Sequence, residues 1–432
     1  MFLPFPISRG AAGVLMSAVI FALGSPSWAA DPLTLVEAQR IAVGRSQQLL
    51  AQDALAVAAR EQAVSAGQLP DPVLKLGIDN LPANGSERFS LTRDFMTQRR
   101  IGLVQELTRA EKRQLRAERF ERNAEQVQAQ RQLTLANVQQ GTALAWLDRY
   151  YAQAACKLLA QQIEEARLQV QAADIGFRTA QGSQADVFAA RVAVIALDDR
   201  LSEVDRQYRS AGLKLVRWVG VAAAERAPSG APPWQSTPLQ NKFSGEHLQR
   251  HPDLLVISAE IDAAETQARL AQANKQSDWS IEASYAQRGP AFSNMLSVGV
   301  SIPLQWDSKN RQDRELAAAL ALVDEARARY EEVMRRHEAE VRGWLNDWQS
   351  GKERVARYRD ALIPTAQQRV EAALTSYRAG KSDLATTLAA RRDVIDARIQ
   401  ALILEQETAR SWAQLNFLVP DQGIAAQAKD QP

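Results

Sequence analysis

The chain has 432 residues, of which 24% are charged, and its formal net charge at pH 7 is +2. This near balance, without a Lys-rich tail or patch, excludes a basic surface of the kind that binds nucleic acid. Aromatic residues make up only 6%, and the stretches rich in Ala, Gln, Arg, Leu and Glu favour long helices over a set of compact cores.

The N-terminus has the pattern of a secretory signal peptide. Arg9 supplies a positive charge, residues 11–23 form an apolar run, and Ser27-Trp28-Ala29 places small residues where signal peptidase reads them. We expect residues 1–29 to be removed, with a retained signal anchor as the alternative. The one cysteine, Cys156, lies far from this point and can form neither a lipid anchor at the mature N-terminus nor an internal disulfide.

Four segments alternate between apolar and polar residues, and they come in two pairs. They span residues 73–81, 101–107, 279–287 and 296–304. In the first segment Leu74, Leu76 and Ile78 share one side, while Lys75 and Asp79 share the other. A period of two predicts strands with one apolar and one polar face. After residue 23 no apolar run approaches the ~20 residues of a membrane helix, so any membrane crossing must use these strands.

Most of the remaining sequence is predicted to be helical. Residues 108–181 contain no proline, and a helix of some 70 residues would be roughly 105 Å long. A second run covers residues 307–363 and continues past Pro364 to Arg378. Shorter helices are expected at residues 33–68, 184–219, 246–276 and 383–418. Their narrow, Ala-rich apolar stripes favour coiled-coil packing between neighbours.

The chain contains an internal repeat. A shift of 200 residues places Phe177-Arg178 on Tyr377-Arg378 and Val194-Ile195 on Val394-Ile395. The order helix, two strands, long helix, turn and helix occurs twice, which indicates a duplicated fold. We expect a first repeat at residues 30–220, a Pro-rich linker at 221–243, a second repeat at 244–419 and a polar tail at 420–432.

These elements predict a tunnel. A sheet of four strands cannot close on itself, and open strand edges are not tolerated in lipid. The chain must therefore share strands with copies of itself, which gives about 8 strands from two copies or about 12 from three. Helices of roughly 100 Å exceed a hydrocarbon core of about 30 Å, so they must project into the periplasm as a second, water-filled barrel.

Several motifs carry a family resemblance over the whole mature chain. They are Leu69-Pro70-Asp71-Pro72, the segment 101–107, Glu111-Lys112-Arg113, and the segments 182–187 and 377–384 that occupy the same place in both repeats. The chain resembles TolC-like outer-membrane factors, in particular those of heavy-metal efflux systems of the resistance-nodulation-division class. The resemblance implies a mainly α homotrimer, with a 12-strand membrane β-barrel and long antiparallel coiled-coil helices. It also implies a periplasmic adaptor protein at the helix tips and an inner-membrane transporter that supplies the energy.

The predicted docking tips are the two helix reversals. The residues expected there are Phe177, Arg178, Gly182, Ser183, Asp186, Tyr377, Arg378, Gly380, Lys381, Ser382 and Asp383. Gly380 supplies the left-handed position that a reversal needs, and Ser183 and Asp383 suit the N-caps of the returning helices. We expect Phe177 and Tyr377 to pack against the neighbouring helix.

The tips also depart from the family pattern. The first repeat has Ala180 where the family turn has Gly, with Gly182 displaced by two positions. The acidic ring that often narrows the periplasmic mouth in this family maps onto Thr386 and Ala389, and only Asp186 keeps an acid nearby. This leaves the gating mechanism open.

The sequence predicts no enzyme, cofactor or metal site. His247 and His251 are spaced for one helix face, but Pro252 disfavours a helix there and no third ligand is evident. His337 lies between Arg336 and Glu338 and is expected on a solvated face. A phosphate loop and a Ser/His/Asp set are both missing from the sequence.

Two other readings share part of this pattern. A periplasmic coiled-coil adaptor or scaffold would explain the signal peptide and the helices, but it would not explain two strand pairs placed alike in each repeat. An exit duct for a type I secretion system would share the fold entirely. The cargo itself is inferred only from the likeness to metal efflux systems.

Overall fold

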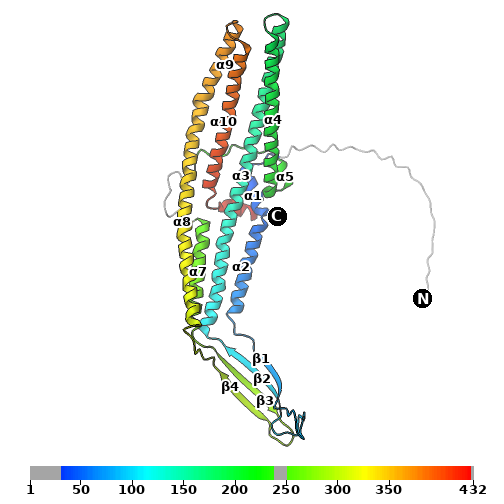
Figure 1. Ribbon diagram of the computed structural model, residues 1–432, viewed down its shortest axis with the longest axis vertical. Helices are drawn as coiled ribbons and strands as arrows, with labels where there is room; N and C mark the ends of the chain where they lie inside the picture. Colours follow the sequence, from blue (N-terminus) through cyan, green and yellow to red (C-terminus); the bar gives the residue numbers. More distant parts are fainter. Residues whose placement is uncertain (1–30, 238–250, 430–432) are drawn as a thin grey trace, which may run out of the picture.

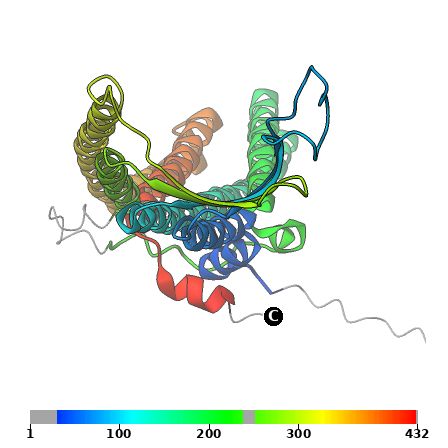
Figure 2. The same cartoon turned by 90° about the horizontal axis from the view of Figure 1, so that it is seen from below.

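The computed structural model describes residues 31–237 and 251–429 of a long, narrow molecule (Figure 1). A small sheet lies at one end, two helical hairpins reach to the other, and further helices surround the middle. Seen along its length, the chain forms an open arc with the hairpins as its two arms (Figure 2). The expected signal peptide at residues 1–29 lies outside the described residues.

The sheet contains four antiparallel strands. These are β1 (Val73–Asp79), β2 (Gln98–Leu107), β3 (Trp279–Gln287) and β4 (Met295–Ser301), in the order β1-β2-β3-β4. The pairing of β2 with β3 joins the two repeats into one sheet. β1 ends before the predicted residue 81 because Asn80 takes a left-handed φ of 57°. β4 ends at Ser301, two residues before Pro303, which has no N–H to donate to a strand ladder.

The first repeat holds the longest helix. Its helices are α1 (Leu35–Arg45), α2 (Gln47–Ala66), α3 (Ala110–Arg178), α4 (Gln184–Val219) and the short α5 (Val221–Glu225). The predicted helix at 33–68 is divided at Ser46, which follows α1 and whose hydroxyl accepts the backbone N–H of Leu49 (3.4 Å) as the N-cap of α2.

The second repeat interrupts its long helix. Its elements are α7 (Pro252–Ala273), α8 (Gln312–Arg357), the π-helical turn η1 (Tyr358–Leu362), α9 (Ile363–Arg378) and α10 (Leu384–Asn416). Pro364 cannot donate to the carbonyl of Asp360, and its ring would clash with that carbonyl in a regular helix. The wider π turn over 358–362 accommodates the proline while the helical path continues from α8 into α9. No helix within residues 31–237 and 251–429 combines the length and apolar character needed to cross a membrane.

The linker and the tail are more ordered than their composition suggests. Residues 221–225 of the expected linker form α5, and Trp234 is buried, whereas residues 238–243 lie outside the described part. The expected polar tail carries α11 (Gln422–Lys429), which packs on α1 and buries Ile424. One large apolar side chain thus anchors a helix whose other residues are small or polar.

The main core lies at mid-height, where α1, α3, α4, α8 and α10 meet. Three tryptophan indoles there donate hydrogen bonds to carbonyls of non-helical segments. Trp146 donates to Leu33 (2.9 Å), Trp348 to Trp234 (2.7 Å) and Trp412 to Ser236 (3.0 Å). Trp146 and Trp348 have no exposed surface. The indoles therefore fix the linker and the N-terminal segment to the long helices.

We predict that Trp348→Phe destabilises the protein by about 1–3 kcal/mol, because it leaves the buried carbonyl of Trp234 without a donor. The measurement is thermal unfolding of the detergent-solubilised protein, followed by the helical circular-dichroism signal. Trp218→Phe is the matched control, because Trp218 packs on Gly141 but makes no indole hydrogen bond to a described residue. Equal losses of stability in the two variants would contradict the role of the indole hydrogen bond.

Candidate duct surfaces and docking tips

One face of the sheet is apolar and uncovered. The register places Leu74, Leu103, Ala283 and Val298 in one row and Leu76, Ile101, Tyr285 and Leu296 in the next. Leu76, Leu296 and Val298 are 71%, 78% and 72% exposed. Apolar side chains in a continuous exposed band mark a surface made for lipid or for another apolar partner.

The opposite face of the sheet is polar, and four of its charged side chains pair with one another. Lys75 Nζ lies 2.8 Å from Glu282 Oε2, and Arg100 lies 2.9 Å from Asp79 Oδ2 and 3.4 Å from Glu282 Oε1. Gly102 and Gly299 occupy the same face. A chain of alternating charges among small residues is suited to a water-filled interior without a strong preference for cations or anions.

The sheet is tied to the helices at one junction. Lys112, in the first turn of α3, contacts Asp278 Oδ2 at 2.8 Å, and its side chain is only 5% exposed. The backbone N–H of Arg109 donates to Asp278 Oδ1 (3.0 Å). Asp278 directly precedes β3, so this carboxylate joins the start of the long helix to the second strand pair.

The first tip connects α3 to α4. The N–H of Gln181 donates to Gly176 O (2.8 Å) and that of Ala180 to Phe177 O (3.2 Å), the pattern of a Schellman motif. Ala180 takes the left-handed conformation, with φ 57°, and Gly182 does not. Ser183 then caps α4 in a reciprocal capping box with Asp186, as expected for Ser183.

The second tip connects α9 to α10 with the same backbone pattern. The N–H of Lys381 donates to Ser376 O and that of Gly380 to Tyr377 O, both at 2.9 Å. Gly380 has a φ of 67°, as predicted. Asp383 caps α10 by accepting the backbone N–H (2.9 Å) and the hydroxyl (2.6 Å) of Thr386. These bonds from Thr386 lower the pKa of the Asp383 carboxyl.

The two tips meet through a small apolar cluster. Ala173, Val187 and Ala190 of the first hairpin pack with Leu384 of the second, and Tyr377 lies against them. Tyr377 therefore packs as expected. Phe177 occupies the equivalent position in the first repeat, but it is 45% exposed and lies outside this cluster. It therefore does not pack as Tyr377 does.

The remaining tip residues lie around the two turns. Arg178 pairs with Asp174 one helical turn earlier (2.7 Å). Arg378 and Lys381 are exposed, and Ser382 is half-buried beside the Asp383 cap. The structure thus brings the predicted set together at one end of the molecule, about 100 Å of helix away from the strands.

The acid expected near the periplasmic mouth is used within its own helix. Asp186 Oδ2 accepts from the backbone N–H (2.9 Å) and the hydroxyl (2.8 Å) of Ser183. Its negative charge lies at the N-terminus of α4, where the helix dipole stabilises it. Thr386 is likewise occupied by the Asp383 cap, and Ala389 carries no charge.

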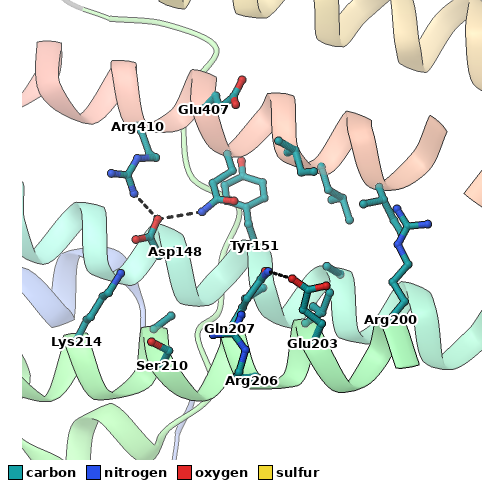
Figure 3. Close-up of a pocket in the computed structure, with 18 residues that line it drawn as sticks. Asp148, Tyr151, Arg200, Glu203, Arg206, Gln207, Ser210, Lys214, Glu407 and Arg410 are labelled. Atoms are coloured by element: carbon teal, nitrogen blue, oxygen red, sulfur yellow. Dashed lines mark hydrogen bonds and ion pairs between the residues drawn. The ribbon is translucent and has the colours of Figure 1, made fainter. Parts of the chain in front are cut away.

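A groove of about 720 Å³ lies between α3, α4 and α10, where the two hairpins face each other (Figure 3). Asp148 on α3 accepts from Gln406 Nε2 (2.9 Å) and pairs with Arg410, both on α10. Glu203 and Gln207 face the groove from α4. These contacts link the long helix of the first repeat to the last helix of the second.

The prediction for His337 was wrong. This residue is only 4% exposed, because α7 packs over this part of α8 and the ring of His251 lies 3.7 Å from that of His337 between centroids. Pro252 does not prevent a helix but begins one, with His251 as the N-cap of α7. His247, the other member of the predicted pair, lies outside the described residues.

Comparison with known proteins agrees with these surfaces. Residues 244–419 match the family model described as outer membrane efflux protein. The chain is 26% identical over 392 residues to the cobalt-zinc-cadmium resistance protein CzcC of Cupriavidus metallidurans, covering 87% of both chains.

Solved channels have the same fold. A structure of CusC superposes with a TM-score of 0.77 at 15% identity, covering 90% of this chain and 92% of that one. The CmeC outer membrane channel of Campylobacter jejuni gives a TM-score of 0.73 at 13% identity, with 98% of each chain covered.

The class defined by this fold is an outer-membrane duct with a periplasmic helical extension. Residues 244–419 match the outer membrane efflux protein family, whose members are transport proteins without enzymatic activity, form trimers and act in tripartite pumps. The predicted fold class is confirmed: a mainly helical repeat that contributes four strands to a trimeric α/β barrel. The function as an outer-membrane efflux channel is confirmed as well.

We predict that Ala180→Gly stabilises the first tip by about 1 kcal/mol, because it removes the steric cost of a left-handed Ala. Hydrogen exchange of the Ala180–Gln181 amides should slow about 5-fold, since 1.4 kcal/mol corresponds to a factor of ten. Ala379→Gly is the control in the second tip, where φ is −83° and glycine brings no relief. Exchange that stays unchanged in Ala180→Gly would contradict the assigned strain.

Proposed function

We propose that three copies of this chain form the exit duct of a tripartite pump that carries heavy-metal cations to the cell exterior. The observation that carries the choice of cargo is the similarity to a cobalt-zinc-cadmium resistance protein over 87% of both chains. The duct is passive. An inner-membrane, proton-coupled transporter of the resistance-nodulation-division class supplies the energy and selects cations from the periplasm or the cytoplasm.

Uncovered apolar stripes support assembly with further copies of the chain. On α2, Leu50, Val57 and Val64 recur at a spacing of seven and are 58%, 54% and 64% exposed. On α4, Val192 and Ile195 are 64% and 66% exposed. Heptad spacing on a long helix is typical of a seam that faces another helix. The outer edges of β1 and β4 also need partners, since open edges are not tolerated in outer-membrane lipid.

The pairing of four charges on the inner sheet face supports a conduit rather than a filter. Lys75 and Arg100 neutralise Asp79 and Glu282, so a passing cation meets no net charge from this group. Selectivity then has to come from the transporter that loads the duct. This division of roles is compatible with many cargoes, and the likeness to the cobalt-zinc-cadmium relative favours divalent metals.

We further propose that a periplasmic adaptor docks end-on at the two tips. Gly380, Lys381 and Arg378 are exposed at the end of the second hairpin, and Gly182 and Ser183 lie at the end of the first. Gly380 has nothing within 4 Å of the position that a Cβ would occupy. An approaching backbone can therefore come close at this point.

The cargo is tested by deleting the gene and restoring it. Loss of the duct should sensitise cells to cobalt, zinc and cadmium, and the intact gene should restore resistance. Growth in graded metal concentrations, with an antibiotic series in parallel, is the measurement. Sensitivity to antibiotics alone would overturn the metal assignment and leave the efflux channel in place.

The docking surface is tested with Gly380→Trp, which should abolish efflux-dependent resistance because the indole blocks end-on approach. Gly85→Trp is the matched control: Gly85 also has a positive φ (83°) and no atom within 4 Å of a Cβ, but it lies in the loop after β1. A cross-linker attached at Lys381 should capture the co-expressed adaptor. Full resistance in Gly380→Trp cells, with no adduct at Lys381, would show that the docking assignment is wrong.

A further inference from the structure

Three potential metal ligands converge where α7 begins beside the middle of α8. His251 caps α7, Asp253 lies in its first turn, and His337 comes from α8. One ligand atom of each residue lies within 4.8 Å of the others. His251 and His337 are 9% and 4% exposed, so the group is buried between the two helices. Apolar side chains of both helices pack beside it, among them Leu254 and Val333.

The spacing of these atoms suits a tetrahedral cation. His337 Nε2 lies 3.4 Å from Asp253 Oδ2. Two ligands that each bind Zn²⁺ at about 2.0–2.1 Å in tetrahedral geometry lie roughly 3.3–3.4 Å apart. The remaining pairs, at up to 4.8 Å, need to close by roughly 1.4 Å at most. This is within the reach of side-chain rotation by His251.

The two nitrogens of His337 point to a missing partner. Neither makes a hydrogen bond of acceptable geometry to a described residue, although the side chain is only 6% exposed. A buried polar group without a partner is costly, and coordination by Nε2 would satisfy it. Nδ1 lies 3.3 Å from Glu340 Oε2, so this carboxylate is placed to accept the second N–H of a coordinating imidazole.

Two competing interactions surround the group. His251 Nδ1 accepts the backbone N–H of Asp253 (3.2 Å). This cap would be lost on coordination, because Nδ1 would then bind the metal itself or, if Nε2 binds it, would carry the ring proton. Arg336 Nη2 lies 3.7 Å from Asp253 Oδ2, but its side chain is 55% exposed and free to turn to solvent.

We propose that His251, Asp253 and His337 bind one divalent cation of the zinc class in each chain, with Glu340 orienting His337. Two imidazoles and a carboxylate form a ligand set typical of Zn²⁺ and similar late first-row metals, with a fourth position for water. The bound cation ties the first turn of α7 to the middle of α8. This site is independent of what the duct carries.

The test is metal binding to the untagged, detergent-purified protein. After removal of metal with a chelator, the protein is titrated with Zn²⁺ alone, and bound zinc is counted after gel filtration. Wild type should retain one Zn²⁺ per chain. His337→Gln and Asp253→Asn should retain none, whereas Asp262→Asn should bind as wild type does, because Asp262 is an exposed acid further along the same helix.

Two further measurements separate coordination from a folding defect. Circular dichroism and gel filtration should be the same for all variants, and Zn²⁺ should raise the Tm of wild type and Asp262→Asn but not that of His337→Gln or Asp253→Asn. Glu340→Gln should weaken binding about 10–100-fold. Co²⁺ should give the intense visible bands of a four-coordinate ion.

A wild-type protein that takes up no Zn²⁺ would overturn the site, and so would a His337→Gln variant that binds as tightly as wild type. Metal binding is measured without transport, so failure here would leave the efflux proposal untouched. Loss of metal resistance in a variant that still binds Zn²⁺ would likewise not contradict the binding site.

Discussion

The outer edges of β1 and β4 impose the constraint on which the rest of the structure depends. A chain that brings only four strands into lipid must pair both edges with its neighbours, because no water is available there to satisfy the backbone. Closure then follows from symmetry, and the apolar face turns outward while Lys75, Glu282 and Arg100 line the water-filled side. The helices leave from one rim of this ring, with Lys112 and Asp278 holding the start of α3 against the second strand pair.

The helical part solves a different problem, since a single layer of helices has little interior to bury. Apolar burial is concentrated at mid-height, where Trp146, Trp348 and Trp412 bind carbonyls of the connecting segments. Above this layer each arm is a two-helix hairpin, and the arms touch near their tips through small residues and Leu384. Sparse apolar contact means low local stability. The tips are therefore the part of the chain best suited to rearrange when a partner binds.

Much of this arrangement could be predicted from the sequence, because lipid-facing and water-facing residues alternate and long helices need no special residues. β3 and α4 have the expected bounds, and Ser183, Asp383 and Gly380 have the expected backbone roles. The break at Ser46 and the π turn before Pro364 were not predicted, since each is a local response to one residue within a helical pattern. The prediction that His337 is exposed was wrong because its charged neighbours in the sequence obscured a stripe of buried residues. Val333, His337 and Val341 recur at a spacing of four and are all buried, a signal that the sequence did contain.

The two repeats share the backbone conformation of their tips but differ in the residues that adopt it. Both tips use the same Schellman hydrogen bonds, yet Gly380 adopts the left-handed position freely while Ala180 does so under strain. Both returning helices begin with a carboxylate that is already occupied, Asp186 by Ser183 and Asp383 by Thr386. Both carboxylates thus serve as caps within their own helices. What holds the two hairpins of one chain together at the mouth is instead the apolar contact of Val187, Ala190 and Leu384. A cluster of this kind weakens little with salt or pH.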